Sequence, residues 1–179
     1  AAELFIELTH ERYAAAVGEH FGKTVPGIFT DEIEAPGWSP VLQEELERGD
    51  GLELSRLAPA LRFDDHPQSR RVRHCAALAR QRLFHERWEK PIADWCARHG
   101  LIWVAEKPVA RPREFAHVHQ PGTDAGHLRV GRSPAPLTVS LRANSRAAAT
   151  TAEQTGRRRV RCECFHSLGW GATLQDQKW

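Results

Sequence analysis

Methionine is absent from this chain of 179 residues, and tyrosine occurs only once. Without a methionine the chain has no initiator, and residues 1–8 (AAELFIEL) already have the pattern of a helix. Residues 173–179 (TLQDQKW) have the pattern of a helix that has just begun, with Thr173 as its cap. We therefore expect the sequence to be an internal piece of a longer protein.

Long apolar runs, Cys-x-x-Cys pairs and phosphate-binding glycine loops are also missing. No run approaches the roughly 20 apolar residues of a membrane span, so we expect no membrane partner. Four cysteines are too few for a disulfide framework in a chain of this size, and Cys75 and Cys96 lie on apolar helical faces. The missing glycine loop removes the usual sign of a nucleotide site.

A strong charge of one sign is lacking as well. The formal net charge is +2, with 27% charged and 41% hydrophobic residues, which is ordinary for one globular domain. The arginine runs at 70–71 and 157–159 lie at the ends of expected elements, where a solvated surface is the default interpretation. The balance gives no reason to expect nucleic acid as a partner.

Helix and strand patterns alternate along the chain. We expect helices over about 1–21, 41–46, 53–61, 69–89 and 144–155, and Pro91 either kinks the fourth of these or opens another helix that ends at Gly100. We expect strands over about 25–29, 101–105, 115–119 and 160–165. Strands spaced for crossover helices form parallel sheets, so the pattern predicts an α/β fold.

Two of these strands deliver a carboxylate near their C-terminal ends. They are residues 27–33 (GIFTDEI) and residues 160–165 (VRCECF), and Glu106 follows a third strand in the same way. A carboxylate in such a run is costly to bury unless it forms an ion pair or a hydrogen bond, or takes part in a reaction. In an α/β barrel the C-terminal ends of the strands form the active face. Paired carboxylates there suit glycoside hydrolysis, in which one protonates the leaving oxygen and the other acts at the anomeric carbon.

Strand alternation separates Glu163 from its neighbours. Cys162 and Cys164 point to one side of the strand and Glu163 to the other. Small apolar thiols suit the helix layer of a barrel, which directs Glu163 into the lumen. Both thiolates, with or without His166, could instead bind one metal ion, although zinc sites usually space their cysteines by two or more residues.

The same alternation puts only one of Asp31 and Glu32 into the lumen. We take Glu32 as the lumenal carboxylate and expect Asp31 to fix the loop or a nearby arginine. The alternative is that both acids cap or form ion pairs locally.

Further residues near the strand ends are candidate contacts for a substrate. Trp38 and Trp170 can stack on the C–H face of a sugar or pack in a core or lid, and Trp103 is expected in the core. Histidines near the lumen mouth can bind sugar hydroxyls or serve the scaffold; they are His117, His119, His127 and His166. The predicted substrate contacts are Asp31, Trp38, Glu106, His127, His166 and Trp170.

Several stretches of the chain resemble the catalytic domain of glycoside hydrolase family 106, the α-L-rhamnosidase family. They are residues 5–13 (FIELTHERY), 27–32 (GIFTDE), 91–96 (PIADWC), and 160–165 (VRCECF) continuing through 169–170 (GW) to 174–179 (LQDQKW). The similarity is strong at both ends of the chain and weak between residues 107 and 143.

The resemblance implies a fold and a mechanism. It implies part of a (β/α)8 barrel of the TIM type, the middle-to-late strands with their helices, within a long and usually exported protein. It also implies inversion of configuration and calcium near the sugar. Carried over, Glu32 looks like the general acid and Glu163 like the general base that activates water.

The sequence thus predicts a glycosidase that acts on carbohydrate, and it leaves two alternatives. One is a non-catalytic carbohydrate-binding or degenerate relative that keeps the barrel. The other is a metal-dependent α/β enzyme that uses the histidines and cysteines.

Overall fold

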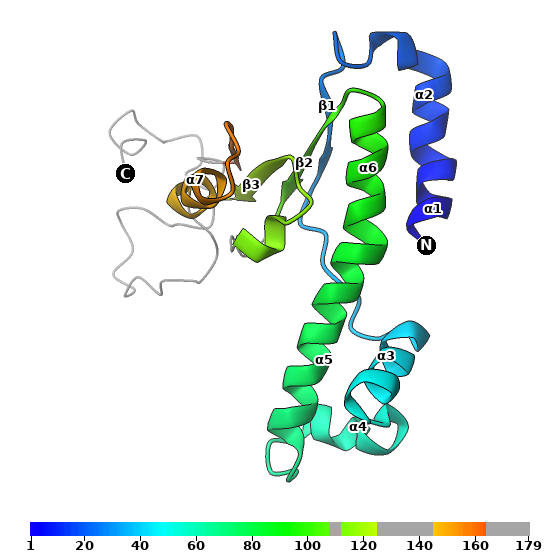
Figure 1. Cartoon of the computed structure of the whole chain (residues 1–179), viewed down its shortest axis with the longest axis vertical. Coiled ribbons are helices and arrows are strands. Elements are labelled where there is room, and N and C mark those ends of the chain that lie inside the picture. Colours follow the sequence, from blue (N-terminus) through cyan, green and yellow to red (C-terminus); the bar gives the residue numbers. More distant parts are fainter. Residues whose placement is uncertain (108–111, 125–144, 164–179) are drawn as a thin grey trace, which may run out of the picture. The chain divides into compact units, whose positions relative to one another are not determined.

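The computed structural model describes residues 1–107, 112–124 and 145–163, which belong to two compact units. The helical unit is Glu34–Pro91 with the first two residues. The sheet unit is Glu3–Ile33 with the described part of Ile92–Trp179. Figure 1 shows the elements of both units. None of the helices in the described ranges has the length and apolar character that a membrane span needs.

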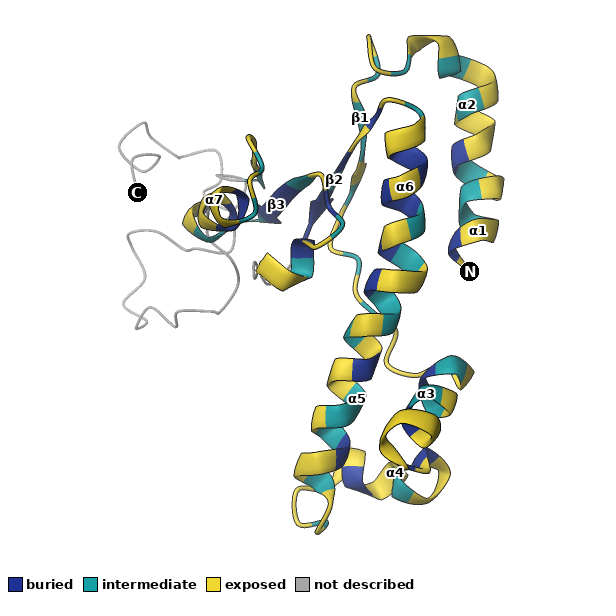
Figure 2. Ribbon diagram, viewed as in Figure 1, coloured by how far each residue is buried: buried dark blue, intermediate teal, exposed yellow. Residues whose placement is uncertain are grey.

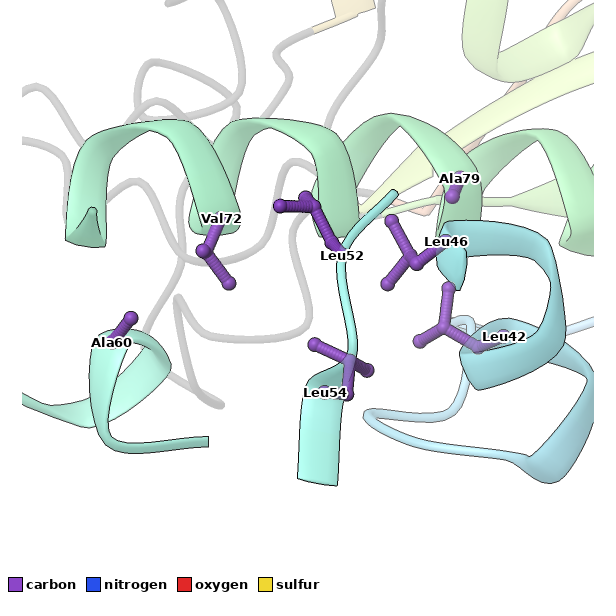
Figure 3. Close-up of a cluster of buried hydrophobic side chains, with 7 residues drawn as sticks. All are labelled: Leu42, Leu46, Leu52, Leu54, Ala60, Val72 and Ala79. Atoms are coloured by element: carbon purple, nitrogen blue, oxygen red, sulfur yellow. The ribbon is translucent and has the colours of Figure 1, made fainter. Parts of the chain in front are cut away.

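Three helices build the helical unit: α3 (Pro40–Asp50), α4 (Leu54–Arg62) and α5 (Ser69–Phe84). The Ser39 hydroxyl caps α3 by accepting the Leu42 N–H at 3.1 Å, and Gly51 ends it in the left-handed region at φ +64°. Aliphatic side chains from all three helices, and from the segment between α3 and α4, form one core, shown in Figure 3; they are Leu42, Leu46, Leu52, Leu54, Ala60, Val72 and Ala79. The helices expected over 41–46 and 53–61 are confirmed.

Pro91 lies in the first turn of an α-helix, as one of the two expectations for it required. It is the second residue of α6 (Lys90–Arg98), which follows a π-helical turn at His85–Glu89. A proline inside a helix lacks an N–H and crowds the carbonyl four residues earlier. A π turn places that carbonyl differently, so the backbone accommodates the proline while staying helical. Helix α6 ends at Arg98, and Gly100, whose φ is +66°, follows two residues later.

Four parallel strands form the sheet: β1 (Gly27–Thr30), β2 (Ile102–Glu106), β3 (Gln120–Asp124) and β4 (Arg161–Glu163). Their order in the sheet is their order in the chain, β1-β2-β3-β4. Helix α6 connects into β2, and α7 (Ser145–Gln154) packs against β3 and β4. The predicted α/β class with a parallel sheet is confirmed.

The third strand lies five residues beyond its expected place, so the strand predicted over 115–119 was wrong. Residues Pro112–Phe115 form a 3-10 turn. The carbonyls of Phe115, Ala116 and Val118, which a strand would use for pairing, accept hydrogen bonds from the Arg157 guanidinium at 2.8–3.0 Å. The true strand, QPGTD, contains Pro121 and Gly122, two residues that strands usually avoid.

Strand register assigns each side chain to one of two faces of the sheet. The buried face carries Trp103, Ala105 and Thr123, each at most 2% exposed, and Trp103 donates its Nε1–H to the Thr30 hydroxyl at 3.1 Å. The opposite face, here called the acidic face, carries Phe29, Ile102, Val104, Glu106, Asp124, Arg161 and Glu163. Buried positions on β2 and β3 are dark blue in Figure 2. The core place expected for Trp103 is confirmed.

An aromatic cluster joins α2 (Glu11–Val17) and the π-helical turn before it (Ile6–His10) to α6. The Trp95 ring on α6 meets His10 edge-on with centroids 4.9 Å apart and stacks on His99 at 4.0 Å. Its Nε1–H donates to the Glu11 carboxylate at 2.7 Å. Helices α2 and α6 therefore lie side by side, as Figure 1 shows.

The hydrogen-bond network assigns one tautomer to His10. The Thr9 hydroxyl donates its single hydrogen to the Phe5 carbonyl at 2.6 Å, so the 2.7 Å contact with Thr9 Oγ1 is donated by His10 Nδ1. Nε2 is then an acceptor; it is buried and has no hydrogen-bond partner in the part of the chain that the structure describes. Burial lowers the pKa of His10, and the nearby Glu11 carboxylate opposes this shift.

We expect the stability of the sheet unit to fall as the pH drops below about 6.5. Because the pKa of His10 is lower in the folded state, the unfolded chain takes up the proton first, and protonation favours unfolding. Thermal unfolding of the full-length protein, followed from about pH 8 to pH 5, checks this. The His10→Gln variant should lose part of the pH dependence, while His20→Gln, at an exposed histidine, should keep it. The same pH dependence in wild type and His10→Gln would contradict the assignment.

Candidate functional site

Five carboxylates lie at one edge of the sheet because parallel strands end on the same side. Glu106, Asp124 and Glu163 are the last residues of β2, β3 and β4, and Asp31 and Glu32 follow β1 directly. The structure therefore places the two predicted acidic strand ends at the same edge, as the sequence pattern requires.

Distances tie these carboxylates into one cluster. One carboxylate oxygen from each of Glu32, Glu106 and Asp124 lies within 4.8 Å of the others. Arg161 donates from Nη1 to Glu106 at 2.5 Å and from Nη2 to Glu163 at 3.3 Å. Glu32 and Glu163, predicted as a working pair, thus belong to the same group of side chains.

Glu106 is the buried member of the cluster, with 2% of its surface exposed. Burial raises the pKa of its carboxyl, and the charge of Asp31 raises it further. The Arg161 guanidinium acts in the opposite direction, while Glu163 and Asp124 add to the increase. The net result is a carboxyl that holds its proton to higher pH than a free glutamic acid does.

Arg161 reaches Glu106 across an intervening strand. In the register Glu106, Gly122 and Arg161 stand at one level on β2, β3 and β4. Gly122 has no side chain, so nothing on β3 blocks the path between the other two. A Cβ at Gly122 would also lie 2.9 Å from the Ala105 carbonyl oxygen, so the backbone there tolerates only glycine without shifting.

Phe29 on β1 supports the same guanidinium. Arg161 Cζ lies 3.9 Å from the centroid of the Phe29 ring, a cation–π contact. Three strand spacings separate β1 from β4, about 14 Å in a flat sheet. A contact across that span indicates a sheet that curves toward the acidic face.

Glu32 has an unusual backbone. Its φ is +36°, and among the described residues it is the only one other than glycine with a positive φ. Such a conformation is costly for a residue with a Cβ and is found disproportionately at functional sites. The side chain is exposed, so solvent and a ligand can reach it.

Cys162 and Glu163 lie on opposite faces of β4, as strand alternation predicts. Cys162 shares the buried face with Thr123, whose hydroxyl is 4.0 Å from the thiol, and Glu163 shares the acidic face with Arg161. The Glu163 side chain is 40% exposed. Cys164 lies outside the described residues.

The other predicted contacts have different outcomes. Asp31 is exposed beside the cluster, and Glu106 belongs to it. Trp38 is 58% exposed and belongs to the helical unit. His127, His166 and Trp170 lie outside the described residues. His117 and His119 are not on a strand, and the His119 Nδ1 accepts the Trp103 backbone N–H at 3.0 Å.

Comparisons of this chain with protein-family models, curated proteins and solved structures find no match. The resemblance to family 106 therefore rests on the motifs quoted above, and the site must be judged by its own chemistry.

The charges and oxygen atoms of the cluster decide how well it fits a metal ion. Within the described ranges, Glu32, Glu106 and Asp124 are the group with spacing suited to a cation, and oxygen donors are those that calcium prefers. However, Arg161 already supplies a positive charge to Glu106, and calcium takes about six to eight oxygens. Three carboxylates, one of them bound to Arg161, supply only part of such a set of oxygens, and no chemical step here is assigned to calcium.

Two residues of the cluster were missed in the sequence. Arg161 precedes Glu163 by two positions, so strand alternation alone puts both on one face. That signal was present but not used. Asp124 was missed because the third strand was placed too early in the chain, which left Asp124 in a loop.

We expect Asp31→Asn to lower the pKa of Glu106, since Asp31 is the charge that raises it most. A carbon-13 NMR titration of glutamate-labelled protein measures this, with Glu106→Gln identifying the signal. The wild-type midpoint should lie above 4.5 and should move down in Asp31→Asn. Asp65→Asn, at an exposed residue of the helical unit, is the control. A midpoint that Asp31→Asn leaves unchanged would contradict the electrostatic account.

Proposed function

We propose that this chain is part of a glycoside hydrolase, of the α-L-rhamnosidase type, with Glu32 as general acid and Glu163 as general base. The observation that carries the proposal is the gathering of both carboxylates, from strands far apart in the sequence, at the C-terminal edge of one parallel sheet. Glycosidases need two carboxylic groups that flank one glycosidic bond, and this edge supplies them.

A (β/α)8 barrel is the architecture we propose for the sheet. Parallel sheets are normally covered on both faces. Here the buried face is covered, whereas on the acidic face Phe29 is 41% and Ile102 39% exposed. Sequential strand order and curvature toward the acidic face both agree with an arc of a barrel wall, whose lumen the acidic face would line.

The exposures of the two carboxylates suit their proposed roles. Glu163 is partly exposed and accepts a hydrogen bond from Arg161, so a water molecule can approach its carboxylate. Glu32 is exposed on a strained loop directly after β1, where it can meet the leaving oxygen of a bound glycoside. Glu106 is too buried to offer much surface to a sugar. Its carboxylate forms an ion pair with Arg161 instead.

Charge at the edge favours an uncharged sugar. The described residues there carry five carboxyl groups, and Arg161 forms ion pairs with two of them, Glu106 and Glu163. A uronic acid or a sulfated sugar would be repelled. A neutral deoxy sugar such as rhamnose meets no such penalty.

The two alternatives are separable from this proposal. A degenerate relative would keep the cluster without turnover. A metal-dependent enzyme built on histidine and cysteine is not favoured, because in the described part of the chain the group with metal-ligand spacing contains carboxylates alone.

Replacing Glu163 by Gln tests the general base. In the full-length protein we expect kcat on an aryl α-L-rhamnoside to fall by roughly 10²–10⁴-fold, because the amide cannot accept a proton from water. KM should change little, since the shape of the side chain is kept. Glu153→Gln, at an exposed position on α7, should leave turnover intact. Full activity in Glu163→Gln would remove Glu163 from the mechanism.

Replacing Glu32 by Gln tests the general acid through the leaving group. Protonation matters most when the departing oxygen is basic. We expect a large loss of kcat/KM on an alkyl rhamnoside and a much smaller loss on an aryl rhamnoside with an acidic phenol. Glu34→Gln, exposed two residues further on, is the matched control. Equal losses on both substrates would show that Glu32 is not the proton donor.

A further inference from the structure

Arg161 contacts residues from three strands of the acidic face, although no part of the proposed acid and base chemistry requires a cation. Its guanidinium touches Glu106 on β2, Glu163 on β4 and the ring of Phe29 on β1. One third of its side chain is exposed, so most of the group is enclosed by these contacts.

Each contact restrains a different motion of the guanidinium. The short bond to Glu106 fixes one end at a carboxylate that is itself buried and cannot move away. The Phe29 ring, 3.9 Å from Cζ, covers one flat side of the group. Nη2 is then left directed at Glu163, which it reaches at 3.3 Å.

Glu163 is the group on which the anchored guanidinium acts, through the 3.3 Å bond from Nη2. It ends its strand and its side chain is 40% exposed, and an exposed glutamate side chain has several rotamers open to it. A fixed donor on the same face, two residues away, selects among these positions. Correct placement of a base within about 1 Å matters, because misplacement on that scale can cost about 100-fold in rate.

We propose that Arg161 is the positioning residue of the general base: anchored by Glu106 and Phe29, it holds the Glu163 carboxylate toward the water that attacks the sugar. This inference rests on the proposed function and adds the residue that orients Glu163, one of the two proposed catalytic carboxylates. Gly122 is part of this arrangement, because a side chain at that position would stand between Arg161 and Glu106.

The test uses the full-length protein with an aryl α-L-rhamnoside, and Arg161→Ala and Arg161→Lys as variants. Arg161→Ala should lower kcat by about 100-fold while KM changes by less than about threefold, as expected when orientation rather than binding is lost. Lysine keeps the charge without the forked geometry, so the kcat of Arg161→Lys should lie between those of the wild type and Arg161→Ala. Arg158→Ala, exposed in the same segment, is the control.

Chemical rescue separates positioning from a merely structural role. Guanidinium chloride at a non-denaturing concentration should restore kcat in Arg161→Ala, relative to sodium chloride at the same ionic strength. It should not restore Glu163→Gln, in which the base itself is gone. Restored turnover without a matching rise in thermal stability supports positioning.

The outcomes distinguish this inference from the proposed function. Active wild type, inactive Glu163→Gln and fully active Arg161→Ala would overturn the role of Arg161 alone. A loss of kcat in Arg161→Ala that follows a loss of folding and resists rescue would also overturn it. A wild-type protein that hydrolyses no rhamnoside would overturn the proposed function, and the role of Arg161 with it.

Discussion

The ion pair between Glu106 and Arg161 is the interaction on which this sheet edge depends. A carboxylate that is 2% exposed is very costly to bury without a partner. Its partner comes from two strands away, across a glycine, so the pair forms only if β2, β3 and β4 keep their register. A slip of one residue on β2 or on β4 would turn one of the two partners to the opposite face. The pair therefore specifies strand register as well as charge balance.

Much of the fold could be predicted because hydrophobic pattern and crossover spacing are local signals. Residues 101–105 and 160–165 identify two strands by their apolar, β-branched or small side chains, and the alternation in the second correctly separates Glu163 from Cys162. The third strand could not be predicted in this way. Its Pro121 and Gly122 argue against a strand, and the apolar residues before it are held in a turn by Arg157, which lies about 40 residues later.

The site was only partly predictable, for a similar reason. The C-terminal ends of parallel strands meet at one edge of a sheet. The sequence alone could therefore predict that Glu32 and Glu163 lie at the same edge. The burial of Glu106 and its dependence on a distant arginine follow from packing across three strands, which no local pattern encodes. The position of Glu106 in the chain predicts a ligand contact, and the structure adds that this carboxylate is buried and paired with Arg161.

The π-helical turn at Ile6–His10 has a consequence for comparing this chain with others. A π turn holds one residue more than the α-helical turn it replaces, so it is equivalent to a single-residue insertion. Deleting one residue there would restore a regular helix and rotate everything before it by about 100° relative to α2. A relative with a regular helix would lack one residue beside His10 in an alignment with this chain. Such a one-residue gap would be compatible with the same fold in both proteins.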